Sequence, residues 1–193
     1  MSAAAGVITH IPKEDGKIII TGTGRAGTTF LMILFSFLKL DTGWDEVTFR
    51  RNIASKCNSG LEKDISAPHR IIKGPDLIRH IKKICAKTKI DLIIIPIRDY
   101  EAAAESRVHN GVGAGGLFGA EDKPTQIAFY HKIMAEYLLD MVQLNIPTIF
   151  LDFKKMVSDP KYVYEKLPTI LGDVTYEDYL AAFEFATKHQ KRS

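Results

Sequence analysis

Four short segments of the chain are apolar along both faces, at residues 17–21, 69–73, 91–97 and 147–152. Longer segments between and after them carry apolar residues at helical spacing. Strands that helices cover on both sides have this continuous apolar pattern, whereas strands that face water alternate. The pattern therefore predicts an α/β protein of three layers (αβα), with helices on both faces of a central, mainly parallel sheet of four or five strands.

Apolar residues at helical spacing predict six longer helices, at residues 27–39, 75–87, 100–109, 124–144, 160–171 and 176–189. Pro75, Pro124 and Pro160 suit the first position of a helix, because the N–H that proline lacks would have no partner there. Asp159 and Thr175 precede the last two helices, and we expect them to act as caps.

Two connections are longer than the others. Residues 40–67 have weak periodicity and are expected to hold one short helix near 45–55, and residues 110–122 are rich in glycine. Both are expected near the carboxyl ends of strands, where an open α/β sheet binds its ligands. Residues 1–16 lack periodicity, which predicts a flexible tail followed by a single domain at 17–193.

Composition narrows the class of protein. Of 193 residues, 46% are hydrophobic and 25% charged, and the formal net charge of +3 suits an anionic small ligand without singling out nucleic acid. Cys57 and Cys85 lie far apart, outside any metal or redox pattern. The most apolar stretch, residues 30–38, is too short to span a membrane, and the first residues lack a secretory signal pattern. We therefore expect a cytoplasmic protein without membrane or nucleic-acid partners.

A glycine-rich segment joins the first predicted strand to the first predicted helix, with the sequence Gly22-Thr23-Gly24-Arg25-Ala26-Gly27-Thr28-Thr29. Glycines let the backbone wrap closely around an anion, and the N–H groups that open a helix donate to it. The hydroxyl groups of Thr28 and Thr29 add further donors. The alternative is a tight turn without a ligand, but the flanking strand and helix favour a phosphate-binding loop, known as a P-loop.

The residues of this segment also indicate which phosphate it binds. In the loops of ATPases and GTPases a Lys follows the last glycine and contacts the β and γ phosphates, whereas Thr28 stands here. Residues 25–30, Arg-Ala-Gly-Thr-Thr-Phe, resemble the loop of the P-loop sulfotransferases that use 3′-phosphoadenosine 5′-phosphosulfate (PAPS). That family carries Lys/Arg-Ser/Ala-Gly-Thr-Thr/Ser followed by an apolar or aromatic residue. The resemblance implies that the donor's 5′-phosphate binds to Gly24, Arg25, Ala26, Gly27, Thr28 and Thr29.

A second resemblance concerns the 3′-phosphate of the donor. Residues 98–107 follow the third predicted strand and are similar to the family segment in which an Arg, and a Ser eight residues later, bind that group; Arg98 and Ser106 have this spacing. The alternative is that Asp99 caps the helix, Arg98 forms a surface ion pair and Ser106 is exposed. Together with the glycine-rich segment, the spacing favours the binding role.

Other segments leave further functions open. Residues 150–160 are similar to a strand-to-helix passage of the same family, but the strand also ends in Asp152 like the metal-binding strand of a kinase. A kinase of small molecules or nucleotides would use ATP and magnesium, with Thr29 and Asp152 around the metal. The family's Lys-x-His motif is missing after the second strand, and its Arg-Lys-Gly segment is missing near the C-terminus. These departures also allow a catalytically inactive nucleotide-binding module.

The resemblance implies an enzyme that transfers a sulfuryl group in line from PAPS to a hydroxyl or amine of a small-molecule or carbohydrate acceptor, releasing 3′-phosphoadenosine 5′-phosphate (PAP). Arg25 would stabilise the charge on the leaving phosphate, with no metal required. Lys73 is a candidate for holding the sulfuryl group or the acceptor, and otherwise a surface lysine. Some carbohydrate-modifying members use a Glu after the first helix as the base, which makes Glu46 and Asp45 candidates; a solvated acidic pair is the alternative.

Three further features have two interpretations each. His69 and His109 are weaker candidates for the base, because a lone His is more often structural or exposed. Residues 111–119 form either a lid over the ligands or simply a flexible connection. Trp44 either stacks on a ligand ring or belongs to the core.

Overall fold

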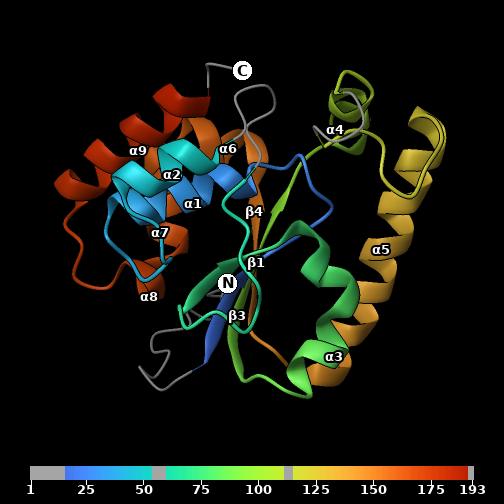
Figure 1. The fold of residues 1–193 in the computed structure, drawn as a ribbon, viewed down its shortest axis with the longest axis horizontal. Helices are drawn as coiled ribbons and strands as arrows, with labels where there is room; N and C mark the ends of the chain where they lie inside the picture. The colour runs from blue at the N-terminus through green and yellow to red at the C-terminus, as the bar shows by residue number, and fades with distance from the viewer. Residues whose placement is uncertain (1–15, 54–59, 111–114, 191–193) are drawn as a thin grey trace, which may run out of the picture.

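The computed structural model describes residues 16–53, 60–110 and 115–190. Within these residues, four parallel strands form one sheet in the order β2-β1-β3-β4 (Figure 1). The strands are β1 (Lys17–Ile20), β2 (Ile71–Lys73), β3 (Ile90–Ile97) and β4 (Thr148–Asp152). The predicted α/β class and parallel sheet are thereby confirmed.

The central strands bury side chains on both faces. Successive side chains of a strand point to opposite sides, so Ile18 and Ile20 of β1 enter one apolar cluster and Ile19 enters another. In β3, Leu92 and Ile93 are divided between the clusters in the same way. Because helices cover both faces of the sheet, polar and apolar residues do not alternate along these strands in the sequence.

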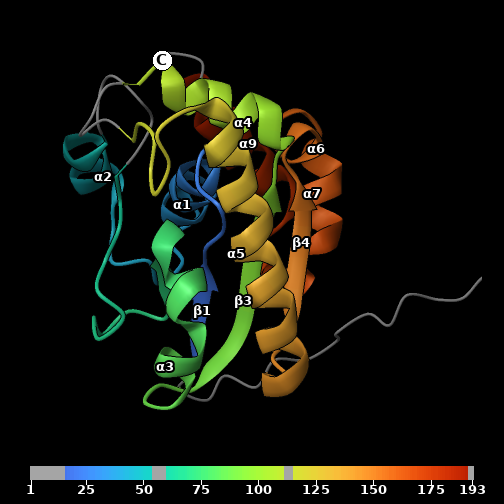
Figure 2. The same cartoon turned by 90° about the vertical axis from the view of Figure 1, so that its right-hand side faces the viewer.

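Helices cover both faces of the sheet, as Figure 1 and the turned view in Figure 2 show. The Ile18 face is covered by α1 (Thr28–Phe37), α2 (Glu46–Asn52), α6 (Phe153–Ser158), α7 (Pro160–Lys166), α8 (Pro168–Leu171) and α9 (Tyr176–Gln190). The Ile19 face is covered by the 3-10 helix η1 (Pro75–His80), α3 (Ile81–Cys85) and α5 (Lys123–Leu144). Helix α4 (Tyr100–Val108) packs on α5. The three-layer arrangement predicted from the sequence is confirmed.

The predicted helix at 75–87 is divided, because its first turn is a 3-10 helix tied to the end of β1. The Thr21 hydroxyl donates to the Pro75 carbonyl at 3.2 Å and accepts from the Ile78 N–H at 2.9 Å. The Ile78 N–H is therefore bonded to β1 and not within a regular α-helix.

The predicted helix at 160–171 is also divided, between α7 and α8. Pro168 has no N–H to donate, and its ring obstructs the preceding turn, so the first helix ends before Leu167. The sequence does not predict α6 as a separate helix. It begins directly after β4, where the Asp152 carboxylate accepts the Lys155 N–H at 2.8 Å.

The predicted caps of the last helices are confirmed. Asp159 accepts the Tyr162 N–H at 3.2 Å, and the Thr175 hydroxyl accepts the Asp178 N–H at 3.1 Å. The short helix expected near 45–55 is α2, over Glu46–Asn52.

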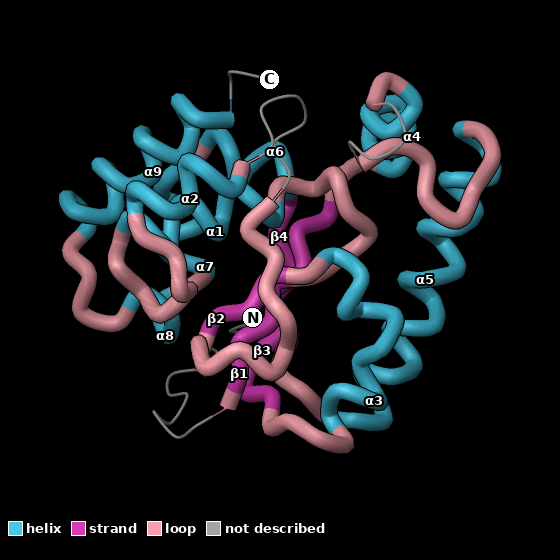
Figure 3. Tube along the Cα trace, viewed as in Figure 1, coloured by secondary structure: helices cyan, strands magenta, loops and turns pink. Residues whose placement is uncertain are grey.

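The connections are marked in Figure 3, where the described residues 60–70 run along the strands before the chain enters β2. None of the helices in the described residues is both long and apolar enough to cross a bilayer. Residues 1–15 of the tail predicted at 1–16, Cys57 and residues 111–114 lie outside the described residues.

The packing of α1 against α9 gives a stability prediction. Phe30 is 2% exposed and meets the Phe183 ring edge to face, with the ring centroids 5.4 Å apart. We expect Phe30→Ala to lower the free energy of unfolding by about 3–5 kcal/mol, because it leaves a cavity in the core. Chemical denaturation followed by circular dichroism measures this loss.

The matched control is Leu139→Ala on α5, where the side chain is 66% exposed. It should change the free energy of unfolding by less than about 1 kcal/mol. Equal losses in the two variants would contradict the assignment of Phe30 to the core.

Candidate functional site

The glycine loop, residues 22–29, joins β1 to α1 at the carboxyl end of the sheet (Figure 1). Positive φ angles occur at Gly22 (148°), Gly24 (81°), Arg25 (57°) and Gly27 (85°). Glycine adopts such angles without strain, whereas they are uncommon for a residue with a side chain such as Arg25. The backbone therefore forms a compact turn directly before the helix.

Close neighbours make a glycine necessary at two positions of the loop. A Cβ atom on Gly27 would lie 2.6 Å from the Met156 methyl and 3.0 Å from the Phe153 ring, both on α6. A Cβ atom on Gly24 would collide with the guanidinium of Arg107. Ala26 between them is fully buried. The loop is thus held between α6 and α4.

The start of α1 differs from the starts of the other long helices. Side chains of Asp99, Asp122 and Thr175 cap α4, α5 and α9. Helix α1 begins after Gly27, which forms no side-chain cap, and its first turn has no acidic residue. The N–H groups and the positive end of the helix dipole are therefore available to an anion. Thr28 and Thr29 stand in this turn, buried to 5% and 6% exposure.

The structure brings Arg98 and Ser106 to the same residue of the glycine loop. The Arg25 guanidinium donates from Nε at 3.1 Å and from Nη2 at 3.0 Å to the Ser106 hydroxyl. The Arg98 guanidinium donates from Nη1 to the Arg25 carbonyl at 3.1 Å, and it lies 4.9 Å from the centroid of the Phe153 ring. Asp99 caps α4 by accepting the Ala102 N–H at 2.9 Å, as the alternative interpretation expects. Arg98, however, forms no ion pair among the described residues.

Arg107 is a residue of the site that the sequence reasoning missed. The residue is 9% exposed, and its guanidinium donates from Nε to the Tyr130 hydroxyl at 2.7 Å and from Nη2 to the Thr23 carbonyl at 3.2 Å. Its Nη1 donates to the Gly116 carbonyl at 2.8 Å and to the Gly115 carbonyl at 3.3 Å. Arg107 therefore connects the glycine loop to α5 and to the glycine-rich connection. The only signal in the sequence is its place beside Ser106.

The charge around the glycine loop is positive. In the described part of the chain, no carboxylate pairs with Arg98 or Arg107. Burial raises the pKa of the Tyr130 hydroxyl, and the nearby guanidinium groups of Arg107, Arg25 and Arg98 partly counter this rise. The three guanidinium groups thus act together on one small region, which favours an anionic ligand.

A pocket of about 170 Å³ borders the glycine loop. One wall is the start of the loop, at Gly22 and Thr23, with Arg107 beside it. The other walls come from η1, from α5 and from Phe118, which lies in the glycine-rich connection. The sequence reasoning did not predict this pocket, because its lining residues come from five separate segments.

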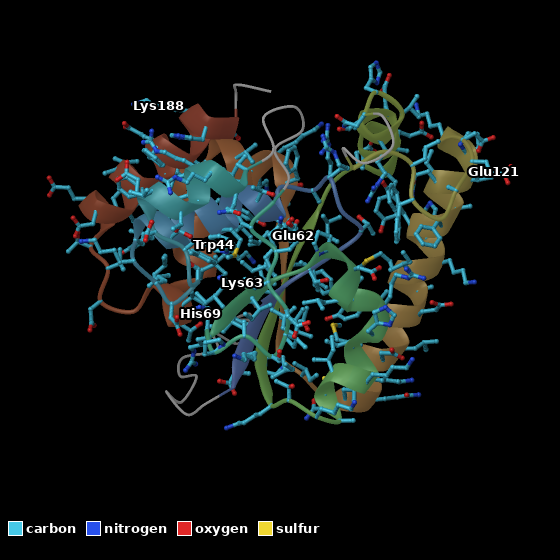
Figure 4. The ribbon with its side chains drawn as sticks, in the orientation of Figure 1. Trp44, Glu62, Lys63, His69, Glu121 and Lys188 are labelled. Atoms are coloured by element: carbon cyan, nitrogen blue, oxygen red, sulfur yellow. The ribbon has the colours of Figure 1, made fainter. Side chains whose placement is uncertain are left out.

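Lys73 lies at the end of β2 but is buried, with 1% exposure. Its ammonium group donates to the Gly60 carbonyl at 2.5 Å and to the Glu62 carboxylate at 2.6 Å. Glu62 lies on the chain that crosses in front of the strands in Figure 4. The surface-lysine alternative is wrong, and the ammonium group pairs with Glu62, whose side chain is 46% exposed.

Asp45 and Glu46, the two candidate bases, both engage in local contacts of α2. Asp45 caps the helix by accepting the N–H groups of Val47 at 2.9 Å and Thr48 at 2.7 Å. Hydrogen bonds from the Thr48 backbone and hydroxyl lower the pKa of Asp45, which makes it a weaker base. Glu46 pairs with Arg50 at 2.8 Å. These contacts support the alternative of a solvated acidic pair at a helix start.

The remaining candidates also have local partners. Trp44 packs at the margin of the core with the Lys63 ammonium 4.1 Å from its ring centroid, and its Nε1 meets no acceptor among the described residues (Figure 4). His69 lies 2.9 Å from the Asp41 carboxylate, and His109 lies 2.8 Å from the Glu105 carbonyl. None of these three side chains lines the pocket beside the glycine loop.

The residues of the kinase alternative lie on separate parts of the sheet. Asp152 ends β4, and β3 separates this strand from β1, which leads into the glycine loop and Thr29. The Asp152 carboxylate caps α6. The described ranges contain no cluster of three or more His, Cys, Asp or Glu side chains arranged for a metal.

Neither protein-family models nor curated proteins match this chain. The fold alone does not decide a function, since one fold supports many activities. The function is therefore argued from the glycine loop and the side chains around it.

The glycine loop gives a second stability prediction. Gly27→Ala places a side chain in the left-handed region, at φ 85° and ψ 19°, which costs about 1–2 kcal/mol. It also adds a collision with α6, for which we expect a further loss of about 1–3 kcal/mol in chemical denaturation.

The matched control is Gly27→Ala in a Met156→Ala background, compared with Met156→Ala alone, because that background removes the nearest colliding group and keeps the backbone cost. An equal loss from Gly27→Ala in both backgrounds would show that Met156 of α6 does not hold the loop tightly.

Proposed function

We propose that this protein is a sulfotransferase, which binds PAPS as donor and transfers its sulfuryl group to a hydroxyl or amine of a small-molecule or carbohydrate acceptor. The observation that carries the proposal is the meeting of Arg98 and Ser106 at Arg25 of the glycine loop. These residues are separated by 73 and 81 positions in the sequence. A ligand with one anionic group on the loop and another near Arg98 and Ser106 would engage both sets of residues.

The glycine loop suits the 5′-phosphate of the donor. Gly24 and Gly27 have no Cβ atoms that would obstruct the backbone at these two positions, and the start of α1 has no side-chain cap. Thr28 and Thr29 add hydroxyl donors, and Arg25 adds a guanidinium. Together these groups favour a bound anion through hydrogen bonds and the helix dipole.

The 3′-phosphate is assigned to Arg98 and Ser106. A guanidinium recognises phosphate with paired hydrogen bonds, and a serine hydroxyl supplies one more donor. Arg98 has no carboxylate partner in the described residues, so a bound phosphate would not have to displace one. This second phosphate is the group that distinguishes the donor from ordinary adenosine nucleotides.

In the proposed reaction PAPS supplies an activated sulfuryl group. The chain itself contributes orientation and charge: the glycine loop fixes the 5′-phosphate, and Arg25 stabilises the negative charge that grows on it as the bond to sulfur breaks. Arg107 holds the Thr23 carbonyl at 3.2 Å, which keeps the loop in place. Such catalysis works through positioning and electrostatics.

Comparison of nucleotide affinities tests the proposal. Isothermal titration calorimetry should show that PAP binds at least about 10-fold more tightly than AMP, because charged hydrogen bonds contribute roughly 1.5–3 kcal/mol each. Arg98→Ala should remove this preference, and Ser106→Ala should reduce it. Neither variant should alter the affinity for AMP by more than about 3-fold.

The matched control is Arg51→Ala, an exposed arginine on α2, which should retain the preference for PAP. Equal affinity of the wild type for PAP and AMP would refute the proposal. Tight binding of ATP that requires magnesium, with turnover lost in Asp152→Asn, would favour the kinase. A preference for PAP without transfer to any acceptor would favour an inactive nucleotide-binding module.

A further inference from the structure

Helix α5 has two uncharged faces, and only one of them packs on the sheet. Its inner face carries the buried residues Tyr130, Ile133 and Tyr137. Along its outer side, residues without charge recur at spacings of three and four: Ala128, His131, Ala135, Leu138 and Val142. All five are exposed, whereas the exposed side of a helix usually carries charged and polar residues. This row, which we call the outer seam, has the spacing of a helix that packs on another helix.

The C-terminal half of the outer seam is apolar and uncovered. Val142 is 80% exposed and Leu138 is 46% exposed, and Leu139 at the margin of the seam is 66% exposed. Helix α5 lies at the right-hand margin of the molecule in Figure 1, and no described segment lies in front of its C-terminal half in Figure 2. At the N-terminal end, by contrast, His131 packs on Tyr100 of α4. Apolar side chains that gather on a surface in this way mark a site of protein interaction.

The edge of the sheet extends this apolar surface. β4 is the edge strand, and the Tyr137 hydroxyl lies 3.2 Å from the Thr148 hydroxyl, so β4 runs beside the C-terminal half of α5. Phe150 lies two residues further along β4, on the same face of the strand, and is 37% exposed. The end of the strand is less accessible, because the Tyr162 hydroxyl accepts the Asp152 N–H at 2.9 Å. The helix is therefore the main contact surface, and the strand adds to its margin.

The outer seam is self-complementary when two copies of α5 lie antiparallel. A two-fold axis at Ala135 places this small residue against its own counterpart, so that the two helices approach closely. It also places Val142 of one copy opposite Ala128 of the other, a large side chain against a small one. The apolar half of each seam is thereby covered by the half with small residues of the other copy.

The charges beside the outer seam have the same symmetry. Lys132 and Glu136 lie on one side of it, 71% and 64% exposed, and their charged groups are 4.0 Å apart within one helix. In the antiparallel pair, Lys132 of one copy lies within about 3 Å of the height of Glu136 of the other, on the same side of the pair. A parallel pair would place the two margins on opposite sides, where these charges do not meet. Charge complementarity thus favours a second, antiparallel copy.

We infer that this chain forms a two-fold symmetric dimer, in which α5 of one copy packs antiparallel on α5 of a second copy around Ala135. The inference goes beyond the proposed function and does not depend on it. The outer seam and its margins supply fewer residues than the roughly 20–30 on each side of a standard interface. The dimer is therefore reversible, with a dissociation constant in the micromolar range.

Sedimentation velocity of the full chain, from about 1 to 200 μM, tests the pairing. The measured mass should rise from that of one copy to that of two across this range. Val142→Glu should raise the dissociation constant at least about 10-fold, because it places a carboxylate in an apolar contact. The variant should keep the circular-dichroism spectrum of the wild type, since Val142 is exposed in a single copy.

The matched control is Gln143→Glu, which adds the same charge to the next residue of α5, outside the outer seam. It should leave the dissociation constant within about 3-fold of the wild-type value.

Disulfide cross-linking tests the antiparallel arrangement. The axis at Ala135 brings the two copies of this residue within reach of a disulfide, so Ala135→Cys should form covalent dimers under mild oxidation. Ala128→Cys is the matched control, because its counterpart in the second copy lies roughly 20 Å away along the pair. It should cross-link no more than the wild type, which carries Cys57 and Cys85.

Three results would overturn the inference. The first is the mass of one copy at every concentration, which would mean that a second copy does not cover the outer seam. The second is an equal dissociation constant for Val142→Glu and Gln143→Glu, which would place the contact elsewhere. The third is equal cross-linking of Ala135→Cys and Ala128→Cys, as a parallel pair would give.

Discussion

The candidate site depends on one buried cation. The Arg107 guanidinium donates to the Thr23 carbonyl, the Tyr130 hydroxyl and two glycine carbonyls of the connection before α5. Burying a guanidinium is unfavourable unless hydrogen bonds replace its water, and here neutral oxygens replace it. The glycine loop, α4, α5 and the connection are therefore held in one arrangement, and no carboxylate in the described part of the chain pairs with Arg107.

Carboxylates cap the starts of several helices. Asp45, Asp99, Asp122 and Asp152 accept backbone N–H groups at the starts of α2, α4, α5 and α6. Helix α1 begins after Gly27 instead, two residues beyond Arg25, whose carbonyl accepts a hydrogen bond from Arg98. The start of α1 is thus a long helix start without a side-chain cap, where free N–H groups and the helix dipole stabilise a bound anion.

The candidate site was only partly predictable from the sequence. The glycine segment is continuous, so its conformation follows from glycines between a strand and a helix. Lys73 ends a predicted strand, but the sequence does not show that its ammonium group forms an ion pair with Glu62, which lies on a long connection. Arg107 was missed, because nothing in its local sequence distinguishes it from a surface residue.

The sequence by itself determined the α/β class, the four strands and most helix starts, because these depend on apolar periodicity and on local capping chemistry. At Pro168 the apolar pattern predicted one continuous helix over residues 160–171, although a proline inside a helix normally interrupts it. Only the tertiary structure decided that Arg98 and Ser106 meet Arg25, and that η1, α5 and Phe118 enclose a pocket at the glycine loop. The physical reason is that such contacts join segments far apart in the chain, and neither their distances nor their burial is encoded in any one of them.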